Sequence, residues 1–194
     1  QTSTGTRNIH MQLSDRVSRI LASKGLYEVR NFSFVSPQLI EKIGLDSNDS
    51  RMNQLKLINP LGEDTSVMRS TLVPSVLNTV SLNQNRNNET AMLYEIAPVF
   101  DVSERKAGDL PHEQPSLCIG AYGKNVDFYL IRDIVMDMLA QFGLHGDIIP
   151  GAEPYHHPGR AAKIMIGEAC IATVAELHPN TMAAFGIAAR LSPK

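Results

Sequence analysis

The sequence contains no long apolar run. No window holds the about 18 consecutive apolar residues that a membrane-spanning helix needs, so we predict no membrane association. The first ten residues, QTSTGTRNIH, also lack the apolar core of a signal peptide. We therefore interpret residues 1–11 as a polar linker and expect the folded module to occupy residues 12–194.

Cysteine is scarce. The 2 cysteines, Cys118 and Cys170, each lie in an apolar run that is typical of a strand. Small secreted domains that are held together by disulfides use more cysteines than this. We expect two reduced thiols in the core of a cytoplasmic protein, and a disulfide only if two strands bring the pair together.

An excess of one charge is also missing. The chain carries 18 Lys and Arg against 20 Asp and Glu, which gives a net charge of −2. Proteins that mainly grip nucleic acid usually show a basic face, whereas the basic residues are scattered here. The composition therefore argues against an autonomous nucleic-acid-binding protein and leaves a minor contact open.

The sequence has enough hydrophobic residues to form a core. Hydrophobic residues make up 43% of the 194 positions, which suits one domain or at most two small ones. Strands follow each other directly twice, which favours an antiparallel sheet with helices on one side, an α+β fold, over a parallel sheet. Hydrophobic periodicity predicts helices over residues 13–24, 37–43, 72–84, 125–142 and 179–186, and strands over residues 27–35, 54–60, 91–101, 115–123, 161–166 and 169–175.

One short segment has reactive side chains in a row: HHPGR, residues 156–160. A metal-dependent hydrolase that uses His156, His157 and Glu153 is one interpretation. Adjacent residues of an extended chain point to opposite sides, so both histidines would not easily bind one ion. The other interpretation is a turn at Pro158 and Gly159, with Arg160 leading into a strand. We favour the turn.

Familiar catalytic motifs are absent. No serine lies in a Gly-x-Ser-x-Gly motif, and no glycine-rich loop ends in Lys-Ser or Lys-Thr. Glu95 is a lone carboxylate in the apolar strand 91–101, and no second acid that could pair with it lies nearby in sequence. A catalytic role is therefore less consistent with the sequence than a sheet carboxylate that is satisfied by a partner.

The helix over residues 72–84 has an unusual polar side. This side is polar but uncharged, which suits contact with another protein, and equally a surface helix with few charges. Its residues are Ser75, Asn78, Thr79, Asn83, Gln84 and Asn85.

Five stretches, in order along the chain, together resemble the β subunit of bacterial phenylalanine–tRNA ligase. The chain departs from the family pattern at Ala97, where glycine is usual, and at Arg132-Asp133, which replace Lys-Gly. The stretches are LSDRVSRILASKGLYEVRNFSFVS, LINPLGEDTSVMRSTLVPSVLNTVSLNQNR, LYEIAPVFD, VDFYLIRDIVMDML and YHHPGRAAKIMIGEACIATVAELHP.

The resemblance implies a class II aminoacyl-tRNA synthetase fold, an antiparallel sheet flanked by helices. It implies a catalytic-like module that does not itself activate phenylalanine, with no catalytic, cofactor-binding or metal-binding residue of its own. Gly186 and Arg190 only loosely resemble the second arginine motif of that class. ATP and magnesium would serve the whole enzyme, whose partners are the catalytic α subunit, in an α₂β₂ assembly, and tRNA. A module that itself contacts tRNA is a further alternative.

The resemblance also assigns roles to particular residues. Structural or turn roles fall to His157, Pro158, Gly159, Arg160, Asn59, Pro60, Arg69 and Glu95. Contact with the α subunit is expected from two helices, through Leu13, Val17, Ile20, Leu72, Val76, Asn78 and Asn83.

Overall fold

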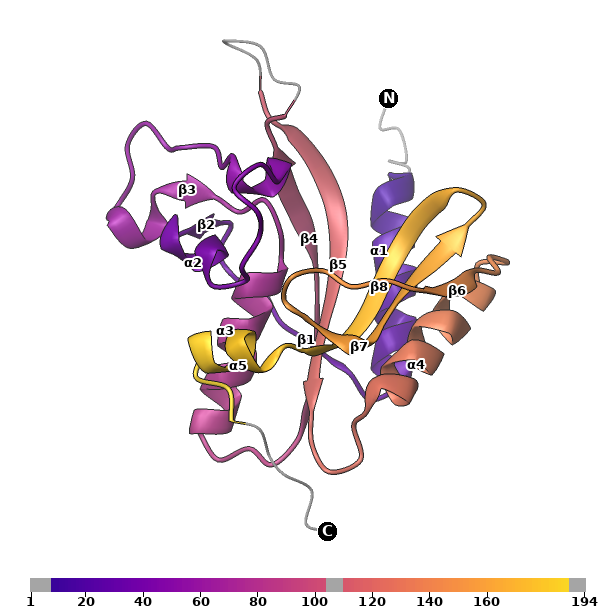
Figure 1. Ribbon diagram of the computed structural model, residues 1–194. Coiled ribbons are helices and arrows are strands. Elements are labelled where there is room, and N and C mark those ends of the chain that lie inside the picture. Colours follow the sequence, from indigo (N-terminus) through magenta and orange to yellow (C-terminus); the bar gives the residue numbers. More distant parts are fainter. Residues whose placement is uncertain (1–7, 104–109, 189–194) are drawn as a thin grey trace, which may run out of the picture.

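The computed structural model describes residues 8–103 and 110–188 (Figure 1). Within this part of the chain, no helix is long and apolar enough to cross a membrane. In chain order, with η for 3₁₀ helices, the elements are α1 (Ile9–Ser23), β1 (Tyr27–Glu28), β2 (Phe34–Val35), α2 (Gln38–Glu41), η1 (Ser50–Met52), η2 (Glu63–Thr65), β3 (Val67–Met68), α3 (Val73–Asn85), β4 (Ala91–Asp101), β5 (His112–Tyr122), α4 (Phe128–Ala140), β6 (Asp147–Pro150), β7 (His156–Ile166), β8 (Ala169–Leu177) and α5 (Pro179–Ala184).

The strands form three sheets. The central sheet has the order β1-β4-β5, with β4 and β5 antiparallel over their whole length and the two-residue β1 parallel to β4. A second antiparallel sheet has the order β6-β7-β8, and β2 and β3 form a small antiparallel pair. The predicted α+β fold with antiparallel sheets is therefore confirmed.

Helices cover both faces of the central sheet, so the expectation of helices on one side only, which came from the order of the elements, was wrong. Successive side chains of a strand point to opposite faces, so Tyr94 and Leu93 of β4 enter different cores. Tyr94 packs with residues of α1, α4, β7 and β8. Leu93 packs with residues of α2, α3 and α5 and with Tyr155. Figure 1 shows the same layering, with α3 and α5 on one side of β4 and β5, and α1 and α4 on the other.

Glycine permits the closest approach between layers. A Cβ atom on Gly120 of β5 would lie 2.6 Å from Val76 Cγ1 and 3.1 Å from Val80 Cγ2. Helix α3 therefore lies directly on β5 at this point, where a larger residue would overlap with it.

Side-chain hydrogen bonds cap the starts of α1, α4 and α5, and the start of α1 differs from the predicted one. Helix α1 begins at Ile9, four residues before the expected Leu13, because Asn8 accepts a hydrogen bond from the backbone N–H of His10 at 3.0 Å. Asp127 caps α4 in the same way, and His178 caps α5.

The predicted strand over residues 27–35 is divided. Its ends form β1 and β2 in different sheets, because the chain leaves the edge of β4 after Glu28. The predicted strand over residues 54–60 is reduced to one bridge between Lys56 and Val67. Strands β3 and β6 were not predicted, because runs of two to four residues carry little periodicity.

Candidate functional site

Four polar side chains from separate parts of the chain meet beside β4: Asn31, Arg69, Thr79 and Glu95. Arg69 Nη1 donates to Glu95 Oε1 at 2.8 Å, and the two side chains are only 3% and 1% exposed. The backbone N–H and the Nδ2 of Asn31 donate to the carboxylate oxygens of Glu95 at 3.1 and 2.8 Å. Buried charges are tolerated when they are paired and hydrogen-bonded, so Glu95 depends on both partners.

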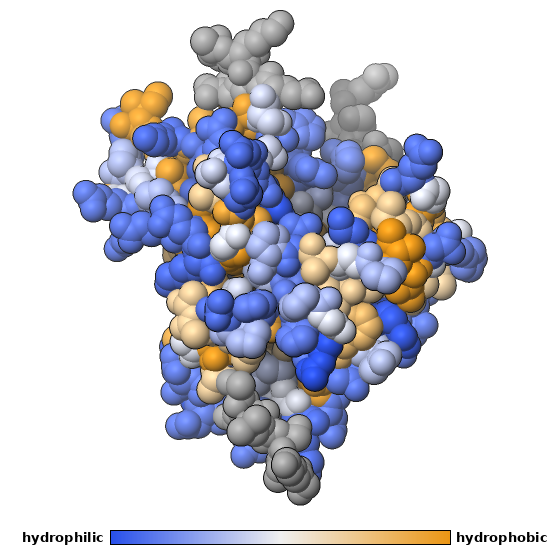
Figure 2. All heavy atoms as spheres, viewed as in Figure 1, coloured by the Kyte–Doolittle hydropathy of each residue, from blue (hydrophilic) through white to orange (hydrophobic). Residues whose placement is uncertain are grey.

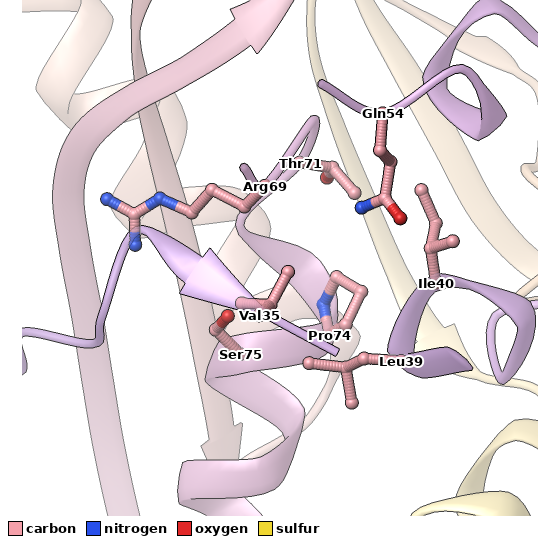
Figure 3. A pocket seen from close by; sticks show the side chains of 8 residues that line it. All are labelled: Val35, Leu39, Ile40, Gln54, Arg69, Thr71, Pro74 and Ser75. Carbon is pink, nitrogen blue, oxygen red and sulfur yellow. The ribbon is translucent and has the colours of Figure 1, made fainter. Parts of the chain in front are cut away.

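Arg69 makes further hydrogen bonds inside the module. Its Nε donates to the carbonyl of Pro98 at 3.1 Å, and Nη1 also donates to the carbonyl of Asn31 at 3.4 Å. Figure 3 shows its guanidinium group turned away from the other side chains around a small pocket. The free space there is about 10 Å³, which is room for about one water molecule. The pocket is lined by Val35, Leu39, Ile40, Gln54, Arg69, Thr71, Pro74 and Ser75.

A larger surface pocket of about 400 Å³ lies beside β2 and β3. Among the described residues that line it, Lys56 is the single cation, and Glu63 and Asp64 are carboxylates. Triphosphates are held by several arginines, lysines or metal ions, so this charge pattern does not suit ATP. The remaining lining residues are Ser36, Pro37, Gln38, Leu57, Ser66 and Val67.

The HHPGR segment differs from the predicted turn. His157, Pro158, Gly159 and Arg160 lie inside β7, which begins at His156, and the register against β8 shifts between His156 and Ala161. The segment is thus an irregular stretch of strand, where proline and glycine are tolerated because the ladder is interrupted. Arg160 forms an exposed ion pair with Glu176 of β8 at 2.5 Å.

The two histidines point to different environments. His156 is buried, and its Nδ1 accepts the backbone N–H of Glu153 at 3.1 Å. The half-buried His157 accepts the backbone N–H of Gly159 at 3.2 Å. The Glu153 carboxylate lies 2.7 Å from Arg51 Nη2. These contacts engage Nδ1 of each histidine and the Glu153 carboxylate, and no cluster of three metal-ligating residues occurs within residues 8–103 and 110–188.

Arg51 ties the loop before it to the start of β7. It also pairs with Asp49 at 2.7 Å, and its hydrogen bond holds the pKa of that carboxyl at about 2. Burial raises the pKa of the neighbouring Tyr155 to about 12, with the Glu153 charge adding to the effect. Burial lowers the pKa of His156, so this imidazole stays neutral near pH 7. The cluster ties Asp49 and Arg51 to Glu153, just before β7.

Three of the residues predicted to contact the α subunit lie in the core of this chain. Ile20, Leu72 and Val76 are only 6%, 2% and 1% exposed, so they offer little surface to a partner. Leu13 and Asn78 are exposed, and Val17 and Asn83 are partly buried.

The polar side of α3 also has fewer side chains free for contact with another protein than the sequence indicates. Thr79 donates to Asn31 Oδ1 at 2.9 Å. Gln84 bonds the backbone of Ala188 through both amide atoms, at 3.4 and 2.9 Å. Ser75 and Gln84 are buried. Several of these side chains thus have partners inside the chain.

The sequence did not single out an aromatic surface near β1 and β2. Tyr27, Phe32 and Phe34 are 73%, 84% and 42% exposed. The available signal was the aromatic content of residues 27–35, which we assigned to an ordinary strand. Figure 2, by contrast, shows a face on which hydrophilic residues dominate and hydrophobic residues form small separate groups.

The structure also places the predicted Asn-Pro segment, the two cysteines and the glycine after α5. Asn59 and Pro60 lie in an exposed loop that the bridge between Lys56 and Val67 helps to close. Cys118 and Cys170 are both free, and Cys170 is exposed rather than in the core. Gly186 adopts a left-handed φ of 63° after α5, and Arg190 lies outside the described residues.

The overall fold is that of a class II aminoacyl-tRNA synthetase core. A crystal structure of pyrrolysyl-tRNA synthetase from Desulfitobacterium hafniense superposes with a TM-score of 0.73 at 14% identity, over 93% of this chain and 63% of that one. A second structure from the same organism, of PylSc, a pyrrolysyl-tRNA synthetase, superposes with a TM-score of 0.66. At these identities the likeness concerns the fold alone.

The chain belongs to the phenylalanyl-tRNA synthetase beta chain CLM domain family, whose model matches residues 1–192. The phenylalanine–tRNA ligase beta subunit of Clostridium acetobutylicum is 38% identical over 91% of this chain, and that of Syntrophotalea carbinolica is 32% identical over 92%. The matches cover 22% and 24% of those subunits, so the chain spans about a quarter of the length of these relatives. The family resemblance in the sequence is therefore confirmed.

Proposed function

We propose that this chain is a non-catalytic, synthetase-like module of a phenylalanine–tRNA ligase β subunit that assembles with the catalytic α subunit. In this proposal the α subunit activates phenylalanine with ATP and magnesium, and the α₂β₂ enzyme attaches it to tRNA in the cytoplasm. The module itself holds no cofactor or metal and contributes surface and rigidity.

The observation that carries the proposal is the buried pair of Arg69 and Glu95. Class II active sites hold ATP phosphates with arginines on the sheet, and such arginines must be free to form bidentate contacts. Here the guanidinium of Arg69 is neutralised by a carboxylate at 2.8 Å and turned away from the adjacent small pocket. Among the described residues, the small pocket that Arg69 lines has room for about 10 Å³, and the larger pocket beside β2 and β3 is lined by one lysine against two carboxylates.

Exposed apolar residues support the assembly part of the proposal. Large apolar side chains that lie exposed on a folded module often mark protein interfaces. Besides Tyr27, Phe32 and Phe34, helix α1 exposes Ile9, Met11 and Leu13, which are 63%, 57% and 44% accessible.

Two measurements on the same protein test the proposal. We expect the chain to co-elute with the α subunit of its enzyme in size-exclusion chromatography. We expect no saturable ATP binding by the chain alone in calorimetry, and ATP–pyrophosphate exchange that requires the α subunit. Saturable ATP binding would refute the non-catalytic role, and separate elution would refute the assembly role.

A further inference from the structure

Three histidine rings accept backbone N–H groups through Nδ1 around the start of β7 and the end of β8. A ring nitrogen accepts a hydrogen bond only when it carries no proton, and in the imidazolium ion both ring nitrogens are donors. All three bonds therefore need neutral rings. The bonds run to His156 from Glu153 at 3.1 Å, to His157 from Gly159 at 3.2 Å, and to His178 from Asn180 at 3.1 Å.

The backbone joins these three histidines into one junction. His156 pairs with Leu177 in the ladder of β7 and β8, and His157 follows His156 directly. After Leu177, His178 donates its backbone N–H to the carbonyl of Tyr155 at 2.9 Å. The start of β7, the end of β8 and the start of α5 thus meet at one place, which we call the histidine junction.

We infer that the histidine junction is a proton-sensitive switch that holds the start of α5 while its rings are neutral and releases it when they are protonated. This inference is independent of the proposed function. A proton on Nδ1 would turn each acceptor into a donor that faces a backbone N–H, so the two groups would repel each other. Burial lowers the pKa of His156, in agreement with a ring that stays neutral in the closed junction.

The charges packed against His156 do not stabilise a proton on its ring. Burial has the largest effect on its pKa, the Glu153 charge acts in the opposite direction, and the Arg51 charge adds to the lowering. The Glu153 carboxylate is already paired with Arg51 at 2.7 Å, and Asp49 is paired with Arg51 at the same distance. The neighbouring Tyr155 is neutral near pH 7, because burial raises its pKa to about 12.

Other charged side chains lie on or against the elements that carry the remaining two histidines. Arg160 of β7 and Glu176 of β8 pair with each other at 2.5 Å. Lys42 Nζ lies 5.3 Å from the centre of the Phe185 ring, which follows α5. One balanced ion pair and one cation do not favour further positive charge at this place.

Opening the junction would loosen α5 from its first residues onward. Phe185 and Ile187, just after α5, are buried in the core on the α3 side of the central sheet, and Figure 1 shows α5 beside α3. There Gln84 of α3 bonds the backbone of Ala188 through both amide atoms, and an amide does not titrate. The imidazole of His178 holds the other end of the helix, so the anchoring of that end depends on pH.

Hydrogen exchange of the whole chain at pH 7.5 and pH 5.5 tests the inference. Exchange rates of single backbone amides, measured by NMR and divided by their intrinsic rates, give an opening constant for each amide. An imidazole with the ordinary pKa of about 6.5 that takes up its proton only after opening raises this constant about 10-fold over that range. We expect such a rise at Asn180, Gly159 and Glu153.

The chain offers matched control amides whose acceptor is a carboxylate. Asp46 accepts the backbone N–H of Asn48, two residues further on, at 2.8 Å, which is the same spacing as at His178. Asp127 caps α4 by accepting the N–H of Leu130 at 2.8 Å. Aspartate ordinarily titrates near pH 4, so the opening constants of Asn48 and Leu130 should change less than about 2-fold over the same range.

His178→Asp separates the imidazole from its position. Aspartate is a favoured N-cap, so the variant should keep α5, and the opening constant of Asn180 should rise less than about 2-fold between pH 7.5 and pH 5.5. His145→Asn changes a histidine between α4 and β6 and should leave the rise at Asn180 intact. The inference is refuted if acid opens Asn180 and Gly159 of the unmodified chain no more than Asn48, or if His178→Asp retains the full rise.

Discussion

Glu95→Gln should destabilise the module strongly, because it leaves Arg69 buried without its counter-charge. The substitution keeps the size of the side chain and its position between Asn31 and Arg69. Removing one partner of a buried ion pair costs about 3–5 kcal/mol. With a urea m-value of about 2 kcal/mol per M, the unfolding midpoint should fall by about 2 M.

Urea unfolding followed by circular dichroism measures this loss, and the chain offers a matched control. Arg160 and Glu176 have the same chemistry and a similar distance, 2.5 Å, but their side chains are 60% and 38% exposed. Exposed pairs contribute about 0–1 kcal/mol, so Glu176→Gln should shift the midpoint by less than about 0.5 M.

A double variant separates charge burial from lost packing. Arg69→Gln combined with Glu95→Gln removes both charges and keeps side chains that form hydrogen bonds. We expect it to be more stable than Glu95→Gln alone by about 1 kcal/mol or more. If Glu95→Gln alone shifts the midpoint no more than the exposed control does, the view that Arg69 is sequestered by this pair is refuted.

Two further predictions concern packing and pH. Gly120→Ala should destabilise the module by about 1–3 kcal/mol, because the new methyl group would overlap with Val76. In thermal unfolding, adding Val76→Ala to this variant should restore part of the stability. The control Gly62→Ala should have little effect, because its Cβ meets open space. The lowered pKa of His156 means that the unfolded chain takes up this proton more readily, so stability should be full above the ordinary pKa of about 6.5 and fall as the pH drops below it. Urea midpoints between pH 5 and pH 8 should show this fall, and His156→Asn should flatten it; an equally steep fall in that variant would assign the effect to another group.

Much of the fold was predictable because its signals are local. Helix α4 and the hairpin of β7 and β8 have strong periodicity, a capping Asp127 and a turn at Gly167, whose φ of 59° suits glycine. Residues 27–35 show the limit of this reasoning. The alternation was real, but which residues faced outward depended on β4 and α3, and a sequence pattern does not specify those neighbours.

The candidate site was harder to predict because its contacts are long-range. Arg69 and Glu95 are 26 positions apart, and Asn31 and Glu95 are 64 apart. Both charged residues were expected to be structural, but nothing local identified them as partners of each other. For the polar side of α3 the sequence indicated too much exposure. Thr79 and Gln84 resembled a protein-binding surface, but Thr79 bonds Asn31 and Gln84 bonds the backbone of Ala188.

The network around Asn31 bears on the non-catalytic part of the proposed function. A guanidinium group that binds ATP must be exposed or must line a site that the ligand fills. Arg69 is instead buried and already paired with Glu95. Freeing it would require the loss of Glu95, and the same loss would release the backbone N–H of Asn31. With Glu95 in this position, one carboxylate holds both the guanidinium of Arg69 and the backbone N–H and side-chain amide of Asn31.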